Sequence, residues 1–225
     1  MVSVNHLSTS AQNYLKAIWA LQEWSTDPVA PSALAAHVGV RPPTVTDAVK
    51  KLAAEGLVAN VRYGAIELTA AGRQAALEMV RRHRLIETYL VNELGYSWDE
   101  VHEEAEHLEH ACSDLMIARI CDKLGNPSRD PHGDPIPAAD GTIEMPDAVP
   151  LHTVAPDSTV IVERIADSNP ELLVHLAELG IAIGDQLRLA PGPPFSDSLL
   201  ARNAAGKKVT LGSGVIHSIW VSLVS

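Results

Sequence analysis

The segment VHEEAEHLEH, residues 101–110, places side chains that bind metal ions at helical spacing. On a helix, steps of three and four residues bring His102, Glu106, Glu109 and His110 to one face. Carboxylates and neutral imidazoles are common ligands of divalent cations. A solvated polar face is the alternative for a helix rich in Glu and His, but four such groups beside an apolar stripe favour a divalent-cation site.

A second pair of the same residue types precedes this segment. Residues 71–94 read as one long helix, on which His83 and Glu87 are one turn apart. An isolated pair of this kind is more often part of a solvated face than a site. His107, with Glu103 and Glu104, lies off the predicted ligand face and is interpreted as solvated or as supporting the ligands. Six other histidines have no partner at ligand spacing, and no role is predicted for them: His6, His37, His132, His152, His175 and His217.

The charge of the chain is concentrated around these groups. The formal net charge is −11 at pH 7, and residues 87–147 alone hold fifteen acidic against three basic residues. Residues 1–72 are neutral, with five of each kind. The middle of the chain is therefore suited to attract cations, while the first third can approach phosphate.

The first third has the pattern of a winged helix-turn-helix. Helices are expected over residues 10–24, from Pro31 to Gly39, and from Pro42 to Gly56. Two strands follow, residues 57–62 and 65–68, joined by the two-residue connection 63–64. A helix, a turn with glycine and a second helix form the usual DNA-reading arrangement, although such a unit can also serve as a protein-interaction module.

The DNA contacts are expected from the start of the third helix and from the hairpin. Residues at the start of a reading helix reach base edges, while basic side chains around it contact phosphates. The residues predicted to contact DNA are Arg41, Pro43, Thr44, Thr46, Asp47, Lys50 and Arg62.

The last third reads as a separate β-domain. Residues 126–156 are rich in proline, glycine and acidic residues and read as a linker with turns. Beyond it, strands are expected over residues 159–165, 186–189, 208–211 and 215–224, with a helix over 170–179. The predicted domains are 1–72 for DNA binding, 73–143 for metal binding and dimerisation, a linker at 144–157, and the β-domain at 158–225.

Composition excludes several classes of protein. Two cysteines, Cys112 and Cys121, are too few for a disulfide scaffold, which suits a reducing compartment. No apolar run has the roughly 18 residues that a membrane helix needs, and the first residues do not read as a signal peptide. We expect a cytoplasmic protein with no membrane partner.

Taken together, these motifs resemble those of a known family. A first helix with the pattern NYLKAI, followed by RRHRLIETYL, VHEEAEHLEH, DPHGDPIP and a C-terminal β-domain, resembles the diphtheria toxin repressor family of metal-dependent repressors. The three-domain manganese transport regulators are the most similar subgroup. The resemblance implies a mainly α N-terminal part and a C-terminal small β-barrel of the SH3-like kind.

The resemblance also assigns ligands to two metal sites. The primary site would use Asn13, Glu106, including its carbonyl oxygen, Glu109 and His110. The ancillary site would use His83, Glu87 and His102, with Asp167 from the C-terminal domain.

Two of these positions indicate which metal is preferred. Iron-dependent members have Cys where this chain has Glu106, and Met where it has Asn13. Replacing sulfur by oxygen favours Mn²⁺ over Fe²⁺, Co²⁺ or Zn²⁺. Manganese regulators typically have Asp where Asn13 stands, and a neutral amide oxygen is a weaker ligand than a carboxylate.

The predicted function is a homodimeric repressor that binds double-stranded operator DNA when Mn²⁺ is bound and controls manganese uptake genes. An iron-responsive repressor of the same family and a metal-independent winged-helix regulator are the alternatives. A metallohydrolase is disfavoured because the cluster has enough ligands to saturate a metal, and no nucleophile or phosphate loop accompanies it. We therefore expect no enzymatic activity and no small organic substrate.

Overall fold

The computed structural model describes residues 4–25, 27–60 and 64–224 of the chain. It divides into two compact units, each of which is described by itself. The first unit comprises Met1–Leu85, Glu106–Asp122 and Ile136–Ile143, and the second comprises Ile86–Ala105, Lys123–Pro135 and Glu144–Ser225. The predicted domain boundaries remain predictions.

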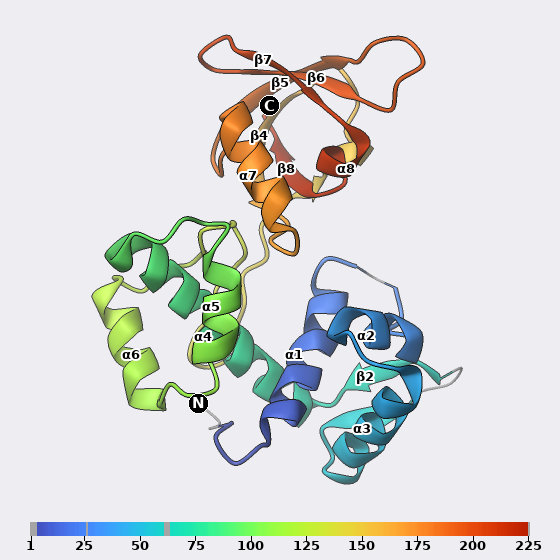
Figure 1. Cartoon of the computed structure of the whole chain (residues 1–225), viewed down its shortest axis with the longest axis vertical. Coiled ribbons are helices and arrows are strands. Elements are labelled where there is room, and N and C mark those ends of the chain that lie inside the picture. Colours follow the sequence, from blue (N-terminus) through green and yellow to red (C-terminus); the bar gives the residue numbers. More distant parts are fainter. Residues whose placement is uncertain (1–3, 26, 61–63, 225) are drawn as a thin grey trace. The chain divides into compact units, whose positions relative to one another are not determined.

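The first unit begins with three short helices and a hairpin (Figure 1). These are α1 (Thr9–Glu23), α2 (Pro31–Val38), α3 (Pro42–Ala54), β1 (Val58–Asn60) and β2 (Ile66–Leu68). The Ser8 hydroxyl accepts a hydrogen bond from the Ala11 amide, 3.2 Å away, and caps α1. Proline starts α2 and α3, and Gly39 ends α2 with a left-handed φ of 70°.

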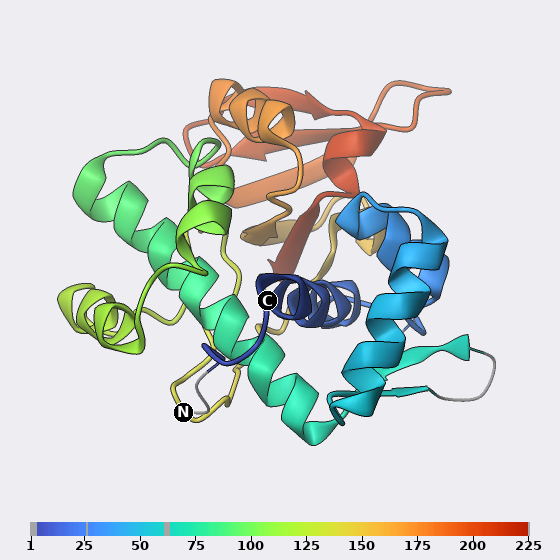
Figure 2. The same cartoon turned by 60° about the horizontal axis from the view of Figure 1, so that its bottom comes forward.

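These elements form the predicted winged helix-turn-helix. Strands β1 and β2 pair antiparallel, with Ala59 opposite Glu67, and Figure 2 shows the hairpin (teal) beside α3 (cyan). The core between the helices is apolar, with Leu15, Ile18 and Leu34 fully buried. The hairpin connection predicted at residues 63–64 falls partly outside the described residues, because Tyr63 is not described.

Helix α4 (Ala70–Leu94) is a single continuous helix, as predicted. It starts in close contact with the hairpin segment, since a Cβ at Gly72 would lie 1.8 Å from the Leu57 carbonyl oxygen. Only glycine fits at this position, so Gly72 determines how α4 leaves the winged helix-turn-helix.

Helix α5 (Val101–Leu108) is shorter than the sequence pattern predicts. The helix ends at Leu108, whose carbonyl oxygen accepts hydrogen bonds of 3.0 Å from the amides of Ala111 and Cys112. Glu109 and His110 therefore lie in a turn before α6 (Asp114–Lys123), and the expectation that they extend a helical face is wrong.

Arg82 of α4 fixes this turn. Its guanidinium is 1% exposed, donates to the Cys112 carbonyl oxygen over 3.1 Å, and pairs with Glu78 and Asp114. A buried cation with these partners holds the backbone next to Glu109 and His110 in one conformation.

The second unit contains a six-stranded antiparallel sheet, with the order β3-β8-β4-β5-β6-β7. The strands are β3 (Val149–Pro150), β4 (Thr159–Ile165), β5 (Gln186–Pro191), β6 (Leu199–Asn203), β7 (Lys208–Leu211) and β8 (Ile219–Leu223). The other elements are the 3-10 turn η2 (Leu151–Thr153), helix α7 (Pro170–Leu179) and the short helix α8 (Ser213–Ile216). Burial alternates along the strands: β7 alternates exposed and buried residues, and β4 alternates half-buried and buried residues over most of its length.

The β-domain is confirmed, with differences from the prediction. In the described part of the chain the sheet is open, since the end strands β3 and β7 do not pair with each other, so the expected barrel is not closed. Strands β3 and β6 were not predicted. Residues 215–224 are not one strand, because α8 precedes β8. The predicted linker also contains buried residues, Gly133 and Asp134 among them, rather than only exposed turns.

No helix within the described ranges is long and apolar enough to cross a membrane.

Candidate metal centre

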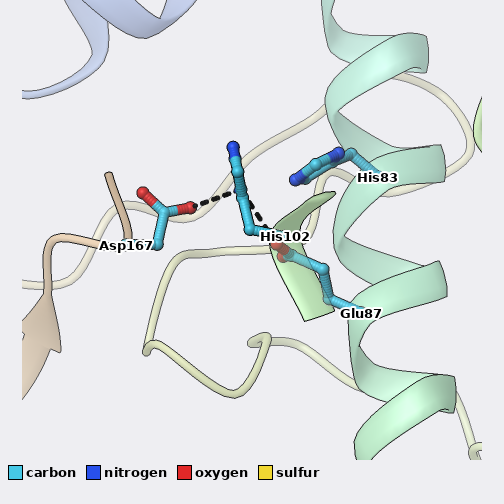
Figure 3. Close-up of side chains that lie close together, drawn as sticks. All are labelled: His83, Glu87, His102 and Asp167. Atoms are coloured by element: carbon cyan, nitrogen blue, oxygen red, sulfur yellow. Dashed lines mark hydrogen bonds and ion pairs between the residues drawn. The ribbon is translucent and has the colours of Figure 1, made fainter. Parts of the chain in front are cut away.

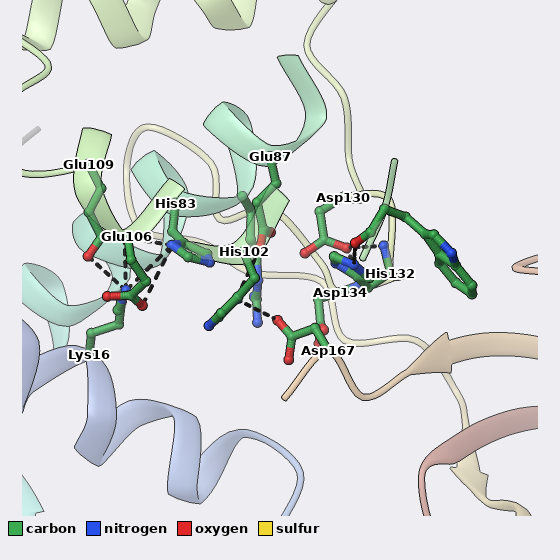
Figure 4. Close-up of polar contacts among 12 residues, drawn as sticks. Lys16, His83, Glu87, His102, Glu106, Glu109, Asp130, His132, Asp134 and Asp167 are labelled. Atoms are coloured by element: carbon green, nitrogen blue, oxygen red, sulfur yellow. Dashed lines mark hydrogen bonds and ion pairs between the residues drawn. The ribbon is translucent and has the colours of Figure 1, made fainter. Parts of the chain in front are cut away.

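A cluster of charged side chains joins α1, α4 and the end of α5 in the first unit (Figure 4). We call Lys16, His83, Glu106, Glu109 and His110 the Glu109 cluster. The Nδ1 atom of His83 lies 2.6 Å from Oε2 of Glu109, and Nζ of Lys16 lies 2.7 and 2.8 Å from the two Glu109 oxygens. Lys16 also donates to Oε1 of Glu106. Glu109 is fully buried, so these contacts are poorly screened by water.

His110 is held with one ring nitrogen available for a metal. Its Nδ1 lies 2.6 Å from Oε1 of Gln12, whose amide nitrogen donates to the carbonyl oxygens of Val4 and Leu7 at 2.9 and 3.3 Å. Because the amide nitrogen is used in this way, the Gln12 oxygen accepts and His110 Nδ1 carries the proton. The lone pair is then on Nε2, 3.4 Å from Oε1 of Glu109. Burial lowers the pKa of His110, which favours the neutral, ligating form.

Asn13 provides an observation that fits a bound cation. Its Oδ1 atom is buried and has no hydrogen-bond partner among residues 4–25, 27–60 and 64–224. A buried amide oxygen without a partner costs free energy, and a cation would offset that cost. Asn13 lies on α1 between Gln12 and Lys16, the two α1 residues that contact His110 and the glutamates.

A second cluster lies in the second unit and is centred on Glu87 of α4. We call Glu87, His102, Asp130, His132 and Asp167 the Glu87 cluster. Nδ1 of His102 lies 3.3 Å from Oε1 of Glu87 and 3.4 Å from Oδ2 of Asp167. Figure 3 draws these three residues with His83, which precedes Glu87 by one turn on the same helix.

The carboxylates around His102 keep its ring charged. Hydrogen bonds to Asp167 and then to Glu87 raise the pKa of His102 to about 10. A metal ion that binds this nitrogen must therefore replace a proton.

Asp130 and His132 also belong to the Glu87 cluster, and neither was predicted from the sequence as a ligand. The potential ligand atoms of Glu87, Asp130 and His132 lie within 4.8 Å of one another, and all three residues are buried (Figure 4). Nε2 of His132 lies 2.7 Å from the Trp98 carbonyl oxygen, an acceptor only, so this nitrogen carries the proton. The other nitrogen, Nδ1, is buried and has no hydrogen-bond partner in the described chain. This is the arrangement of a metal-ligating histidine.

The loop that carries these two residues is tied to strand β4. The Ile165 amide donates to the His132 carbonyl oxygen over 2.9 Å, and Nε of Arg164 lies 2.6 Å from Oδ1 of Asp134. Gly133 has a φ of 89° and fits tightly against β4, because an added Cβ would lie 2.1 Å from the Glu163 carbonyl oxygen. The signal in the sequence is the motif DPHGDP, which lies within the stretch predicted as a linker.

The structure therefore brings together much of each predicted ligand set. Glu106 and Glu109 converge, and Glu87, His102 and Asp167 converge. His83, expected with the second set, lies one turn from Glu87 on α4 and also contacts Glu109. The donors in both clusters are oxygen and nitrogen, without sulfur, which suits cations harder than Cu⁺.

The predicted DNA contacts lie on the exposed side of α3 or beside it. Arg41, Pro43, Thr44, Thr46, Asp47 and Lys50 are all exposed, whereas Val45 and Val49 are buried in the core. Arg62 falls outside the described residues.

Three family models match successive parts of the chain. They are described as iron dependent repressor, N-terminal DNA binding domain, at residues 6–66; iron dependent repressor, metal binding and dimerisation domain, at residues 69–138; and FeoA domain, at residues 149–223.

Individual relatives resemble the chain over nearly its whole length. A solved structure described as a manganese-dependent transcriptional repressor in complex with manganese is 48% identical, covers 95% of this chain and 100% of its own, and has a TM-score of 0.90. The structure of ScaR with bound Zn²⁺ is 32% identical, covers 95% of this chain and 99% of its own, and has a TM-score of 0.81. The iron-dependent repressor IdeR of Mycobacterium leprae is 28% identical over 98% of this chain and 100% of its own.

Proposed function

The chain belongs to the diphtheria toxin repressor family of metal-dependent transcriptional repressors, and from this premise we propose that Mn²⁺ is the metal that activates it. It is a transcription regulator and not an enzyme. The proposed activity is repression of manganese uptake genes by a homodimer bound to operator DNA in the cytoplasm.

The observation that carries the choice of metal is the donor set around Glu109. Two carboxylates, the Nε2 atom of a neutral His110 and the unsatisfied amide oxygen of Asn13 are available, and no thiolate or thioether is among them. Oxygen ligands suit Mn²⁺. The solved relative that is 48% identical is described as a complex with manganese, which supports the same choice.

The proposed ligands fall into two sets. Asn13, Glu106, Glu109 and His110 would hold the activating ion, whose double charge would offset the two carboxylates. Glu87, His102, Asp167, Asp130 and His132 would hold a second ion. His83 is kept with the second set, as the resemblance implies: the contact of its Nδ1 with the Glu109 carboxylate would orient the ring, and its Nε2 would bind the ion.

The mechanism is a population shift in which α1 is the moving part of the switch. Asn13 and Gln12 belong to the DNA-binding end of the chain, whereas Glu109 and His110 belong to the turn after α5. If Asn13, Glu109 and His110 held one ion, with Gln12 orienting His110, the position of α1, and with it that of α3, would be fixed. The two reading helices of a dimer must match half-sites about 34 Å apart, so fixing them favours DNA binding. By thermodynamic linkage, bound DNA must then raise the affinity for the metal by the same factor.

The test is DNA binding by the full chain as a function of free metal concentration. DNA duplexes selected from a random pool in the presence of Mn²⁺ serve as probes, and fluorescence anisotropy measures binding with Mn²⁺, Fe²⁺ and Zn²⁺ at fixed salt. We expect activation by Mn²⁺ and a two-fold symmetric footprint.

The same titration separates the alternatives. Activation by Fe²⁺ at a lower free concentration than Mn²⁺ would make the protein an iron-responsive repressor, the function named for IdeR. Binding that is equal with and without metal would make it a metal-independent winged-helix regulator.

A further inference from the structure

Lys16 occupies the centre of the Glu109 cluster, and the metal assignment gives it no role. Its Nζ lies 2.7 and 2.8 Å from the two oxygens of Glu109, contacts Glu106, and lies 3.4 Å from Nδ1 of His83 (Figure 4). The Lys16 side chain is only 15% exposed. This is a well-enclosed ammonium ion rather than a surface lysine.

The ammonium compensates a charge that would otherwise destabilise the cluster. The Glu109 carboxylate is fully buried and Glu106 is partly buried, and two carboxylates at such short range repel each other. A buried carboxylate needs a partner that neutralises it. Lys16 is that partner for both.

Lys16 also uses the atoms that a metal ion needs. Both oxygens of Glu109 accept from Nζ, and one oxygen of Glu106 does so too. An ammonium ion and a divalent cation, both positively charged, cannot occupy the same small space between these carboxylates.

We propose that Lys16 is an internal cation that holds the Glu109 cluster in the metal-free protein and is displaced when a divalent ion binds. This inference rests on the proposed function, because it takes Glu106 and Glu109 to be ligands. Lys16 competes with the metal and so raises the free metal concentration at which the repressor responds. Because Lys16 is on α1, its release also removes a contact that holds this helix in its metal-free position.

The first experiment compares the metal affinity of Lys16→Met with that of the wild-type protein. Methionine keeps the unbranched chain and removes the charge. Isothermal titration with Mn²⁺ should give a dissociation constant about tenfold lower for the variant, within the range usual for coupled binding. Without metal, the variant should melt at a lower temperature than the wild type, and saturating Mn²⁺ should restore most of the difference.

Lys123→Met is the matched control. Lys123 pairs with Glu93 on the surface, 3.1 Å apart, and is 60% exposed. This variant loses one lysine and one ion pair away from Glu106 and Glu109, so its Mn²⁺ affinity should equal that of the wild type.

A second experiment needs no variant. Lysine-reactive labelling of the wild-type protein, followed by mass spectrometry, should modify Lys16 slowly without metal and several-fold faster with Mn²⁺. If Lys16→Met binds Mn²⁺ no more tightly than the wild type, or if Mn²⁺ leaves Lys16 equally or better protected, Lys16 is not displaced and the inference is wrong. Failure of the wild-type protein to bind Mn²⁺ at all would instead overturn the proposed function.

Discussion

His102 shows how a single side chain links metal binding to pH. Its contacts with Asp167 and Glu87 raise its pKa to about 10, so the ring is charged near pH 7. In the unfolded chain a histidine has a pKa of about 6.5. The protonated ring therefore stabilises the metal-free fold fully below pH ~6.5, and this contribution is lost as the pH rises towards about 10.

We predict that the stability difference between the wild-type protein and His102→Gln shrinks as the pH rises from about 6 to about 9 without metal. Chemical unfolding with a chelator present measures this difference. Metal binding at the Glu87 cluster should also release a proton, which titration calorimetry in buffers of different ionisation enthalpy detects. A stability difference that does not depend on pH would show that His102 is not charged in the fold.

Substitutions of Asn13 compare an amide with a carboxylate as a metal ligand on α1. Asn13→Asp adds a negative charge where the buried oxygen has no partner, and we expect Mn²⁺ to activate DNA binding at a free concentration roughly five- to a hundredfold lower. Asn13→Ala should shift activation the other way. Fluorescence anisotropy with Mn²⁺ measures both variants, and three indistinguishable curves would mean that residue 13 does not bind the metal.

At the residue scale, helical spacing alone predicted which side chains have ligand chemistry, whereas the grouping of Glu87, His102 and Asp167 came from the family resemblance. Spacing along one helix placed His102 with Glu106, whereas the structure places His102 with Glu87 and Asp167. His132 has no ligand partner within its own segment, so only the tertiary fold reveals its role. Lys16 could not be recognised because its partners are 90 and 93 residues away.

The loop that carries Asp130 and His132 is an element whose position depends on one glycine. Gly133→Ala would force a Cβ to within 2.1 Å of the Glu163 carbonyl oxygen, at a φ of 89° that alanine avoids. We expect a loss of about 2 kcal/mol or more in unfolding free energy, because a strained backbone and a clash both act. Binding of a second metal ion should weaken as His132 moves.

Gly184→Ala is the control for this prediction. Gly184 has a φ of 85°, but its added Cβ would meet nothing within 4 Å, so this variant reports the backbone strain alone. Denaturant unfolding of both variants separates strain from the clash, and equal losses would mean that the contact with β4 does not matter.

At the element scale, helices were easier to predict than their exact ends. Proline and glycine marked α2 and α3 almost to the residue, because capping is a local property. The end of α5 at Leu108 carries no such local signal, and it depends on the buried Arg82, which holds the turn beyond it. The short strands β3 and β6 were missed; β3 pairs with the distant strand β8, whereas β6 pairs with its neighbours β5 and β7.

At the scale of the whole molecule, an exposed apolar surface on α6 suits the association of two chains. The family model that matches residues 69–138 is described as a dimerisation domain. Within it, α6 exposes two large apolar side chains, Leu115 at 68% and Met116 at 50%. Exposed apolar groups on one helix suit a surface that another copy covers.

We predict that Leu115→Glu converts the proposed dimer to a monomer and reduces operator affinity at least tenfold, because each chain would then bind a half-site alone. Sedimentation velocity measures the mass, and a calorimetric Mn²⁺ titration checks that the metal site is intact. Leu94→Glu, an exposed leucine on α4, is the comparison. A Leu115→Glu variant that remains dimeric would place the interface elsewhere.

The hydrogen bonds that connect Val4, Gln12 and His110 have a practical consequence for the purification of this protein. Val4 is fully buried, and its carbonyl oxygen accepts from Gln12, which in turn orients His110. We therefore expect an affinity tag fused at the amino terminus to disturb the contact between Val4 and Gln12, so that metal dissociation constants measured on such a fusion would depend on the tag. A tag at the carboxyl terminus, or one removed before titration, leaves His110 in its native orientation.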